Sequence, residues 1–232
     1  MIRKIYENLK PFRFRLAIFT ILSGASLLSV ILVRLRIEMS GTADYAILVW
    51  NLFLAWLPLL ISYAASGFVS RRRFTAIIVL PAAALWLLFF PNAPYILTDL
   101  IHLRHPREYV PVWFDTLLIN WFAWTGMLLG VYSLFLMQTL VRRAFGRIAG
   151  WIFVLIVGTL CGVGTYIGRF LRWNSWDVVF DPLARLSELL TYAMNPSLQS
   201  ITFISIFSSL FIFIYVATYS FGLLLHEQQE PK

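Results

Sequence analysis

The chain has 232 residues, of which 60% are hydrophobic and only 13% are charged. Soluble globular domains carry about 25% charged residues, so this composition excludes a soluble enzyme or binding domain. The formal net charge is +8, yet we expect no nucleic-acid partner, because the basic residues lie at the ends of apolar runs, where they set membrane topology. The single cysteine, Cys161, lies within an apolar run, which excludes an intrachain disulfide and a thiolate metal cluster.

Six apolar runs approach the length of about 20 residues that a helix needs to cross a hydrocarbon core. We therefore predict an all-α integral membrane protein, a bundle of six transmembrane helices that forms one polytopic domain over residues 1–232. Arg34 and Arg36 follow the first run where a signal peptide would carry small residues, so we expect that run to be retained. The predicted spans are residues 16–33, 45–68, 74–90, 113–140, 148–171 and 201–225.

The distribution of charge predicts the orientation of the bundle. Twelve of the 19 lysines and arginines lie before the first run, in the turns after the second and fourth runs, or at the last residue. Eight of the 11 acidic residues lie on the other side. Because basic residues near span ends stay in the cytoplasm, we predict a multi-pass protein of the cytoplasmic (inner) membrane with both termini cytoplasmic.

A short amphipathic helix is predicted at residues 182–194, on the outer side. Asp181 and Pro182 have the residue types preferred at the N-cap and at the first helical position. Leu183, Leu186 and Leu190 recur at helical spacing. About a dozen residues are too few to span a bilayer, so we expect this helix to lie along the outer interface.

Polar side chains are concentrated where the third run ends, around Pro91. On a helix that starts near Asn92, the residues Tyr95, Asp99 and His102 fall on one face together with Thr98. Ionisable groups at membrane depth are costly and are default candidates for a functional site. Asp99 and His102 are three residues apart, so the carboxylate could orient the imidazole as an acid–base pair.

The fifth span carries a matching stripe with Thr165, Arg169, Arg172 and Trp176 at helical spacing. Arg169 lies about one turn inside the outer end and needs an anionic partner or a water-filled cleft. We therefore predict that the two faces oppose each other around one polar pocket, with Asp99 in hydrogen-bond or one-water reach of Arg169 or Arg172. The candidate ligand-binding residues are Asn92, Tyr95, Asp99, His102, Arg169, Arg172, Asn174 and Asp177.

Two stretches carry a resemblance to a known family, FFPNAPYILTDLIHL at residues 89–103 and YIGRFLRWNSWD at residues 166–177. With them the chain resembles the domain of unknown function 1361 family of bacterial membrane proteins, over most of its length. The resemblance implies a multi-span membrane architecture and no particular activity.

A metal site is not expected, although Asp99, His102, His105 and Glu108 repeat every three residues, because Pro106 disfavours helical geometry at His105. The sequence contains none of the established motifs for zinc proteases, phosphate loops or nucleophile elbows, so we expect no metal and no cofactor.

Three classes of function stay open. The first is binding or transport of a small or lipid-borne anionic ligand at an outward-facing polar site, which the two arginines favour. The second is a membrane enzyme that acts on a lipid-linked substrate at the outer leaflet, with Asp99 and His102 as the catalytic candidates. The third is an accessory or assembly protein whose glycine-lined faces, at Gly158 and Gly162 or at Gly164 and Gly168, bind a membrane-protein partner or a second copy.

Overall fold

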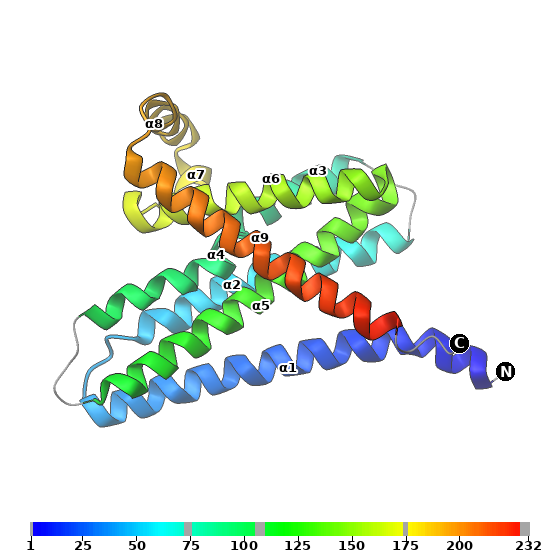
Figure 1. Ribbon diagram of the computed structural model, residues 1–232, viewed down its shortest axis with the longest axis horizontal. Coiled ribbons are helices and arrows are strands. Elements are labelled where there is room, and N and C mark those ends of the chain that lie inside the picture. Colours follow the sequence, from blue (N-terminus) through cyan, green and yellow to red (C-terminus); the bar gives the residue numbers. More distant parts are fainter. Residues whose placement is uncertain (1, 72–75, 105–109, 174–175, 228–232) are drawn as a thin grey trace.

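A computed structural model describes the backbone of residues 2–71, 76–104, 110–173 and 176–227 as helices joined by short turns (Figure 1). Two of the elements are not α-helical: η1 is a 3-10 helix and η2 is a π-helix. In chain order the elements are α1 (Ile2–Ser40), α2 (Ala46–Arg71), α3 (Ala76–Phe89), α4 (Asn92–Tyr95), η1 (Ile96–Arg104), α5 (Val112–Phe145), α6 (Arg147–Tyr166), η2 (Ile167–Leu171), α7 (Asp177–Phe180), α8 (Pro182–Met194) and α9 (Leu198–Glu227).

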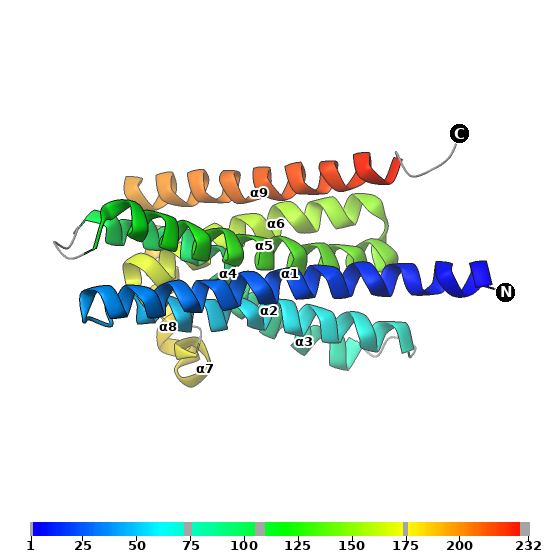
Figure 2. The same cartoon turned by 90° about the horizontal axis from the view of Figure 1, so that it is seen from below.

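Six segments are long and apolar enough to cross a membrane, so the predicted six-span, all-helical fold is confirmed and the chain is a multi-pass membrane protein. The helices run back and forth along one axis, and α1 begins at the same end of the bundle where α9 ends (Figure 2). We call this the terminal end, and the other the opposite end. The six segments are Arg15–Ser40, Ala46–Gly67, Pro81–Ile101, Val112–Phe145, Arg147–Leu171 and Leu198–Leu225.

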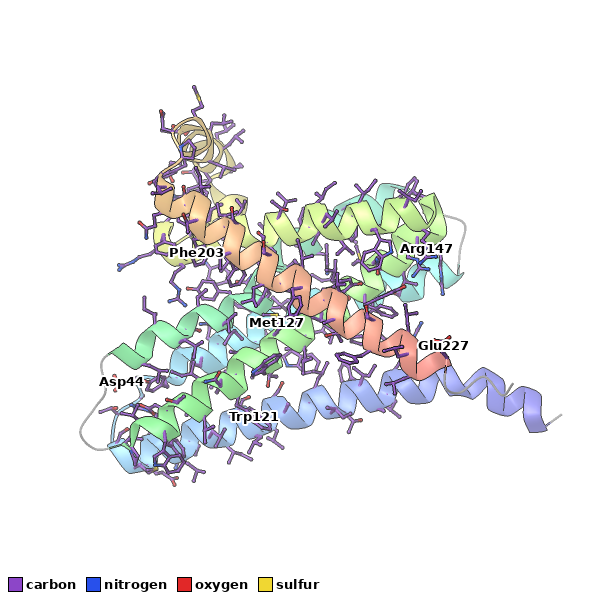
Figure 3. The ribbon with its side chains drawn as sticks, in the orientation of Figure 1. Asp44, Trp121, Met127, Arg147, Phe203 and Glu227 are labelled. Atoms are coloured by element: carbon purple, nitrogen blue, oxygen red, sulfur yellow. The ribbon has the colours of Figure 1, made fainter. Side chains whose placement is uncertain are left out.

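Helix α5 is the centre of the bundle, because it contacts α1, α2, α6 and η1. One apolar cluster fills the space between α1, α2, η1 and α5, with Leu52 and Phe122 among its buried residues. A second cluster joins α3, α5, α6 and α9 around Trp86 and Phe211. Met127 belongs to the second cluster and lies near the middle of the molecule, where α9 crosses α5 (Figure 3).

The third span differs from the prediction, which ended it at residue 90. Helix α3 has only 14 residues, and at 1.5 Å per residue it is about 21 Å long, too short for a core of about 30 Å. The chain turns at Pro91 and continues through α4 and η1, and the apolar span runs to Ile101. The polar stretch therefore belongs to the second half of a discontinuous span. It does not lie in a loop beyond the span.

The first helix is also longer than predicted, because α1 continues to Ser40 and does not end at residue 33. Arg34 faces solvent and pairs with Glu38 one turn later, at 2.9 Å. Arg36, by contrast, is fully buried. Because the predicted span ended at residue 33, we expected both arginines to lie in the following loop. They lie instead on opposite faces of α1.

The predicted amphipathic helix is present as α8, with the predicted bounds. The Asp181 carboxylate accepts a hydrogen bond from the backbone N–H of Ala184 at 3.4 Å, and Pro182 occupies the first turn. Leu183, Leu186 and Leu190 are exposed. Helix α8 projects from the bundle at the opposite end and runs across the direction of the long helices (Figure 1).

The orientation of the bundle in the membrane is testable with engineered cysteines, because the native Cys161 is fully buried. Ala144 is exposed at the terminal end, in the last turn of α5, and Ser197 is exposed at the opposite end, before α9. In a Cys161→Ser background we expect Ser197→Cys to react with a membrane-impermeant maleimide in intact cells. Ala144→Cys should react only after permeabilisation, and the reverse pattern would contradict the predicted topology.

Candidate functional site

The break in the third span is a proline turn that side-chain and backbone hydrogen bonds stabilise. Prolines lack an N–H and disrupt helical bonding, and the segment contains Pro91 and Pro94. The Asn92 side-chain amide donates to the carbonyl of Phe89 at 2.9 Å, and the Tyr95 N–H donates to the carbonyl of Pro91 at 3.0 Å. From Ile96 onward the chain is a 3-10 helix. The α-helical face predicted for residues 95–102 is therefore wrong in its geometry.

The end of the fifth span is irregular too, since α6 passes into the π-helix η2, which holds Arg169. This end packs closely on the proline turn. A Cβ on Gly164 would lie 2.4 Å from Cγ of Pro91, and one on Gly168 would lie 3.2 Å from the Tyr95 ring. The two glycines therefore allow the broken ends of two spans to approach each other, as expected for small residues at helix interfaces.

Asp99 and Arg169 form an ion pair where these two interrupted spans meet. The guanidinium Nη2 donates to Oδ1 of Asp99. It also donates to the Thr98 hydroxyl at 2.6 Å, while Nε donates to the same oxygen at 2.9 Å. The amide of Asn51, on α2, donates to Oδ2 of Asp99 at 3.0 Å. The predicted contact between the two polar stripes is thus present.

The two partners of this ion pair differ in exposure. The Asp99 side chain is 2% exposed, whereas that of Arg169 is 15% exposed. The guanidinium carbon also lies 4.6 Å from the centre of the Tyr95 ring, which favours a cation. Removing charges from water is costly and is offset only by close pairing with further hydrogen bonds, and this site supplies both. The part of the ion pair that is exposed is the cationic guanidinium, because the carboxylate is the enclosed partner.

Arg172 ends η2 in the left-handed conformation, with φ of 58°, the only described residue other than glycine with positive φ. This conformation costs a non-glycine residue about 1 kcal/mol or more. Its side chain is exposed, and the described ion pair of Asp99 is with Arg169. Irregular helical turns and strained residues recur at functional sites, and here both lie within three residues of Arg169.

The other predicted site residues do not all join this ion pair. Asn92 is half-buried and bonds the backbone of Phe89, and Asp177, at the start of α7, is half-buried. Trp176 packs near Trp50 of α2, with 6.1 Å between the ring centres. The side chain of His102 and all of Asn174, His105 and Glu108 lie outside the described residues, so their predicted roles are untested.

The described side chains of the two stripes are in direct contact at Asp99 and Arg169. The guanidinium touches the carboxylate, which is almost fully enclosed.

A second buried ion pair, Arg36–Asp115, was missed by the sequence analysis. Nε of Arg36 donates to Oδ1 of Asp115 at 2.9 Å, and the two side chains are 0% and 7% exposed. The guanidinium carbon lies 4.0 Å from the centre of the Tyr45 ring. Burial, followed by the Asp115 carboxylate, raises the pKa of the Tyr45 phenol. The sequence signal for this pair was an arginine flanked by apolar residues directly after a span. The pair joins α1 to α5.

Both glycine pairs of the fifth span are covered by the chain itself. A Cβ on Gly158 would lie 2.5 Å from Ile212, and one on Gly162 would lie 2.2 Å from the Ser208 hydroxyl, both on α9. Gly164 and Gly168 face the proline turn, as described above. The glycine faces are therefore packing surfaces within the chain, and they do not provide the partner surface on which the assembly hypothesis rested.

Gly164→Ala tests whether this close approach assembles the site. We expect a loss of stability of about 1–3 kcal/mol, as for other overpacked positions, because the added methyl group would meet the rigid Pro91 ring. Gly24→Ala, on α1, is the matched control, since nothing lies within 4 Å of its Cβ position. Thermal unfolding in detergent measures both variants, and equal stability of the two would refute the packing argument.

The ion pair itself predicts non-additive effects on stability. Asp99→Asn leaves the half-buried guanidinium of Arg169 without its carboxylate, and breaking a fully buried pair typically costs about 3–5 kcal/mol. The double variant Asp99→Asn/Arg169→Gln leaves no unpaired charge, so it should be more stable than Asp99→Asn alone. A double-mutant cycle on unfolding free energies checks this, and strictly additive effects would show that the two charges are not coupled.

Comparisons with known proteins give one match. No curated protein and no solved structure matches the chain. A family model described as "Protein of unknown function (DUF1361)" matches residues 50–221, a region that includes both broken spans and the Asp99–Arg169 pair but not Arg36. The chain therefore belongs to the DUF1361 family of proteins of unknown function.

Proposed function

We propose that the protein binds a small or lipid-borne anion at the outer face of the membrane, with Arg169 as the principal contact. The observation that carries this proposal is the meeting of two interrupted spans at one partly exposed arginine. Membrane transporters form ligand sites at such discontinuous helices, where backbone geometry and charge are available at membrane depth. With the positive-inside orientation, this end of the bundle is the outer end.

The electrostatics favour an anion over a cation. The enclosed partner is the carboxylate of Asp99, so a ligand that arrives from outside meets the guanidinium first. The described contacts of Arg169 use Nε and Nη2, and Nη1 is not part of them. A phosphate or carboxylate would accept charge-assisted hydrogen bonds from Nη1. The exposed Arg172, three residues further on, would add a second positive charge at the entrance.

Asp99 is then the internal counter-ion that a ligand must compete with. Asp99 pairs with Arg169 in the structure, and a ligand anion would take over part of that role. This competition would couple ligand binding to a rearrangement of the proline turn, since Asp99 and Thr98 both lie on η1. Such coupling is what transport requires, because a ligand shifts a conformational equilibrium only through contacts that differ between the states.

The described contacts of Asp99 are less suited to a role as a general base. A general base must be free to take a proton in a productive geometry. Asp99 already accepts hydrogen bonds from Arg169 and from Asn51. An anion site is therefore the function that the described contacts support best.

The proposal predicts opposite effects of the two charge-removing variants. The probes are inorganic phosphate, succinate and dihexanoylphosphatidic acid, each added to the purified protein in neutral detergent, and binding is read from the shift in thermal unfolding. At least one probe should stabilise the wild type. Arg169→Gln should weaken its binding tenfold or more, since a charged hydrogen bond contributes about 1.5–3 kcal/mol. Asp99→Asn should strengthen it, because the internal competitor is removed.

Two controls separate binding from general destabilisation. Arg36→Gln breaks the buried Arg36–Asp115 ion pair and should lower stability without changing the affinity for the probe. Arg34→Gln removes an exposed positive charge and should change neither. Failure of all three probes to stabilise the wild type, or unchanged affinity in Arg169→Gln, would refute the anion site. Preference for phosphatidic acid over phosphate would assign a lipid-borne ligand.

A further inference from the structure

A large groove lies between α1, α5 and α9, in the half of the bundle that holds both termini. Its volume is about 790 Å³, within the range of about 300–1,000 Å³ typical of ligand pockets. The walls are largely apolar, and the described residues that line it include Ile18 and Ile21 of α1, Phe135 of α5 and Leu223 of α9. It is separate from the Asp99–Arg169 site, because the two share no lining or contacting residue.

One end of the groove is strongly basic. Arg142 and Arg143 lie in the last turn of α5, Arg147 begins α6, and all three line the groove. Arg147 lies at this end of the bundle, where Glu227 ends α9 (Figure 3). The guanidinium of Arg142 donates to the Tyr219 hydroxyl at 2.7 Å, so it is held in the wall. Arg143 and Arg147 are exposed.

An apolar trough with a cationic end fits an amphiphile with an anionic headgroup. The trough lies within spanning segments, where the surrounding medium supplies lipid chains, and the arginines lie at the span ends, at headgroup depth. A small soluble anion would leave the apolar walls unused. A second copy, inserted in the same orientation, would bring its own basic end to the same depth, and like charges at an interface are unfavourable.

We infer that this groove is a binding site for an anionic phospholipid. One acyl chain lies along the trough between α1, α5 and α9, and Arg143 and Arg147 bind the phosphate of the headgroup. In the predicted orientation the lipid belongs to the cytoplasmic leaflet. The site is distinct from the proposed outer anion site, and neither depends on the other.

Native mass spectrometry of the purified full-length protein tests the inference with two lipids of equal chain composition. The wild type should retain palmitoyl-oleoyl-phosphatidylglycerol at least tenfold more tightly than palmitoyl-oleoyl-phosphatidylcholine. Arg143→Gln/Arg147→Gln should remove this preference. Gly222→Leu should weaken the retention of both lipids, because Gly222 lines the groove and has open space around its Cβ position.

The matched controls are Arg34→Gln, which removes an exposed arginine elsewhere, and Gly24→Leu, which adds the same side chain at another open position outside the groove lining. Both should bind lipid as the wild type does. Equal retention of the two lipids by the wild type would overturn the inference. So would full retention by Gly222→Leu, which would place the lipid outside the groove, or a dimer that forms with loss of the lipid.

Discussion

The Asp99–Arg169 ion pair is the interaction on which the half of this bundle away from the two termini depends. A buried carboxylate is tolerated only with a close, hydrogen-bonded partner, and here the partner comes from a span 70 residues away. Where the two residues meet, neither span is a regular α-helix. The third span continues as a 3-10 helix after its proline turn, and the fifth span ends in a π-helix. Both irregularities lie beside glycines that allow the backbones to approach. The charge pair and the broken helices are therefore parts of one arrangement.

The second ion pair, Arg36–Asp115, shows what a purely structural pair looks like in the same protein. It joins two uninterrupted α-helices, α1 and α5, and its arginine is fully enclosed. The arginine of the Asp99 pair lies on irregular backbone and keeps part of its surface exposed. Because of this contrast, we propose that Arg169 binds a ligand and that Arg36 holds α1 against α5.

The sequence predicted features that depend on local chemistry. Asp181 and Pro182 begin α8 because the cap and the fixed proline φ are properties of neighbouring residues. The contact between Asp99 and Arg169 followed from the cost of leaving either charge alone at membrane depth. Features that depend on the packed neighbours were missed. A run such as residues 96–104 does not reveal whether it will be α-helical or 3-10, because the choice depends on how it packs against α2 and α5. Likewise, the sequence alone placed Arg36 just beyond the end of a span, because it does not reveal the partner, Asp115, on α5.

The central claim is that an external anion reaches Arg169 and displaces part of its contact with Asp99. The most direct measurement is a crystal structure with tungstate, a phosphate analogue whose anomalous signal identifies it without ambiguity. Our account predicts an anomalous peak within hydrogen-bonding distance of the Arg169 guanidinium, together with a longer separation between that group and the Asp99 carboxylate. Tungstate at the exposed arginines of the terminal end alone, with the Asp99–Arg169 contact unchanged, would contradict it.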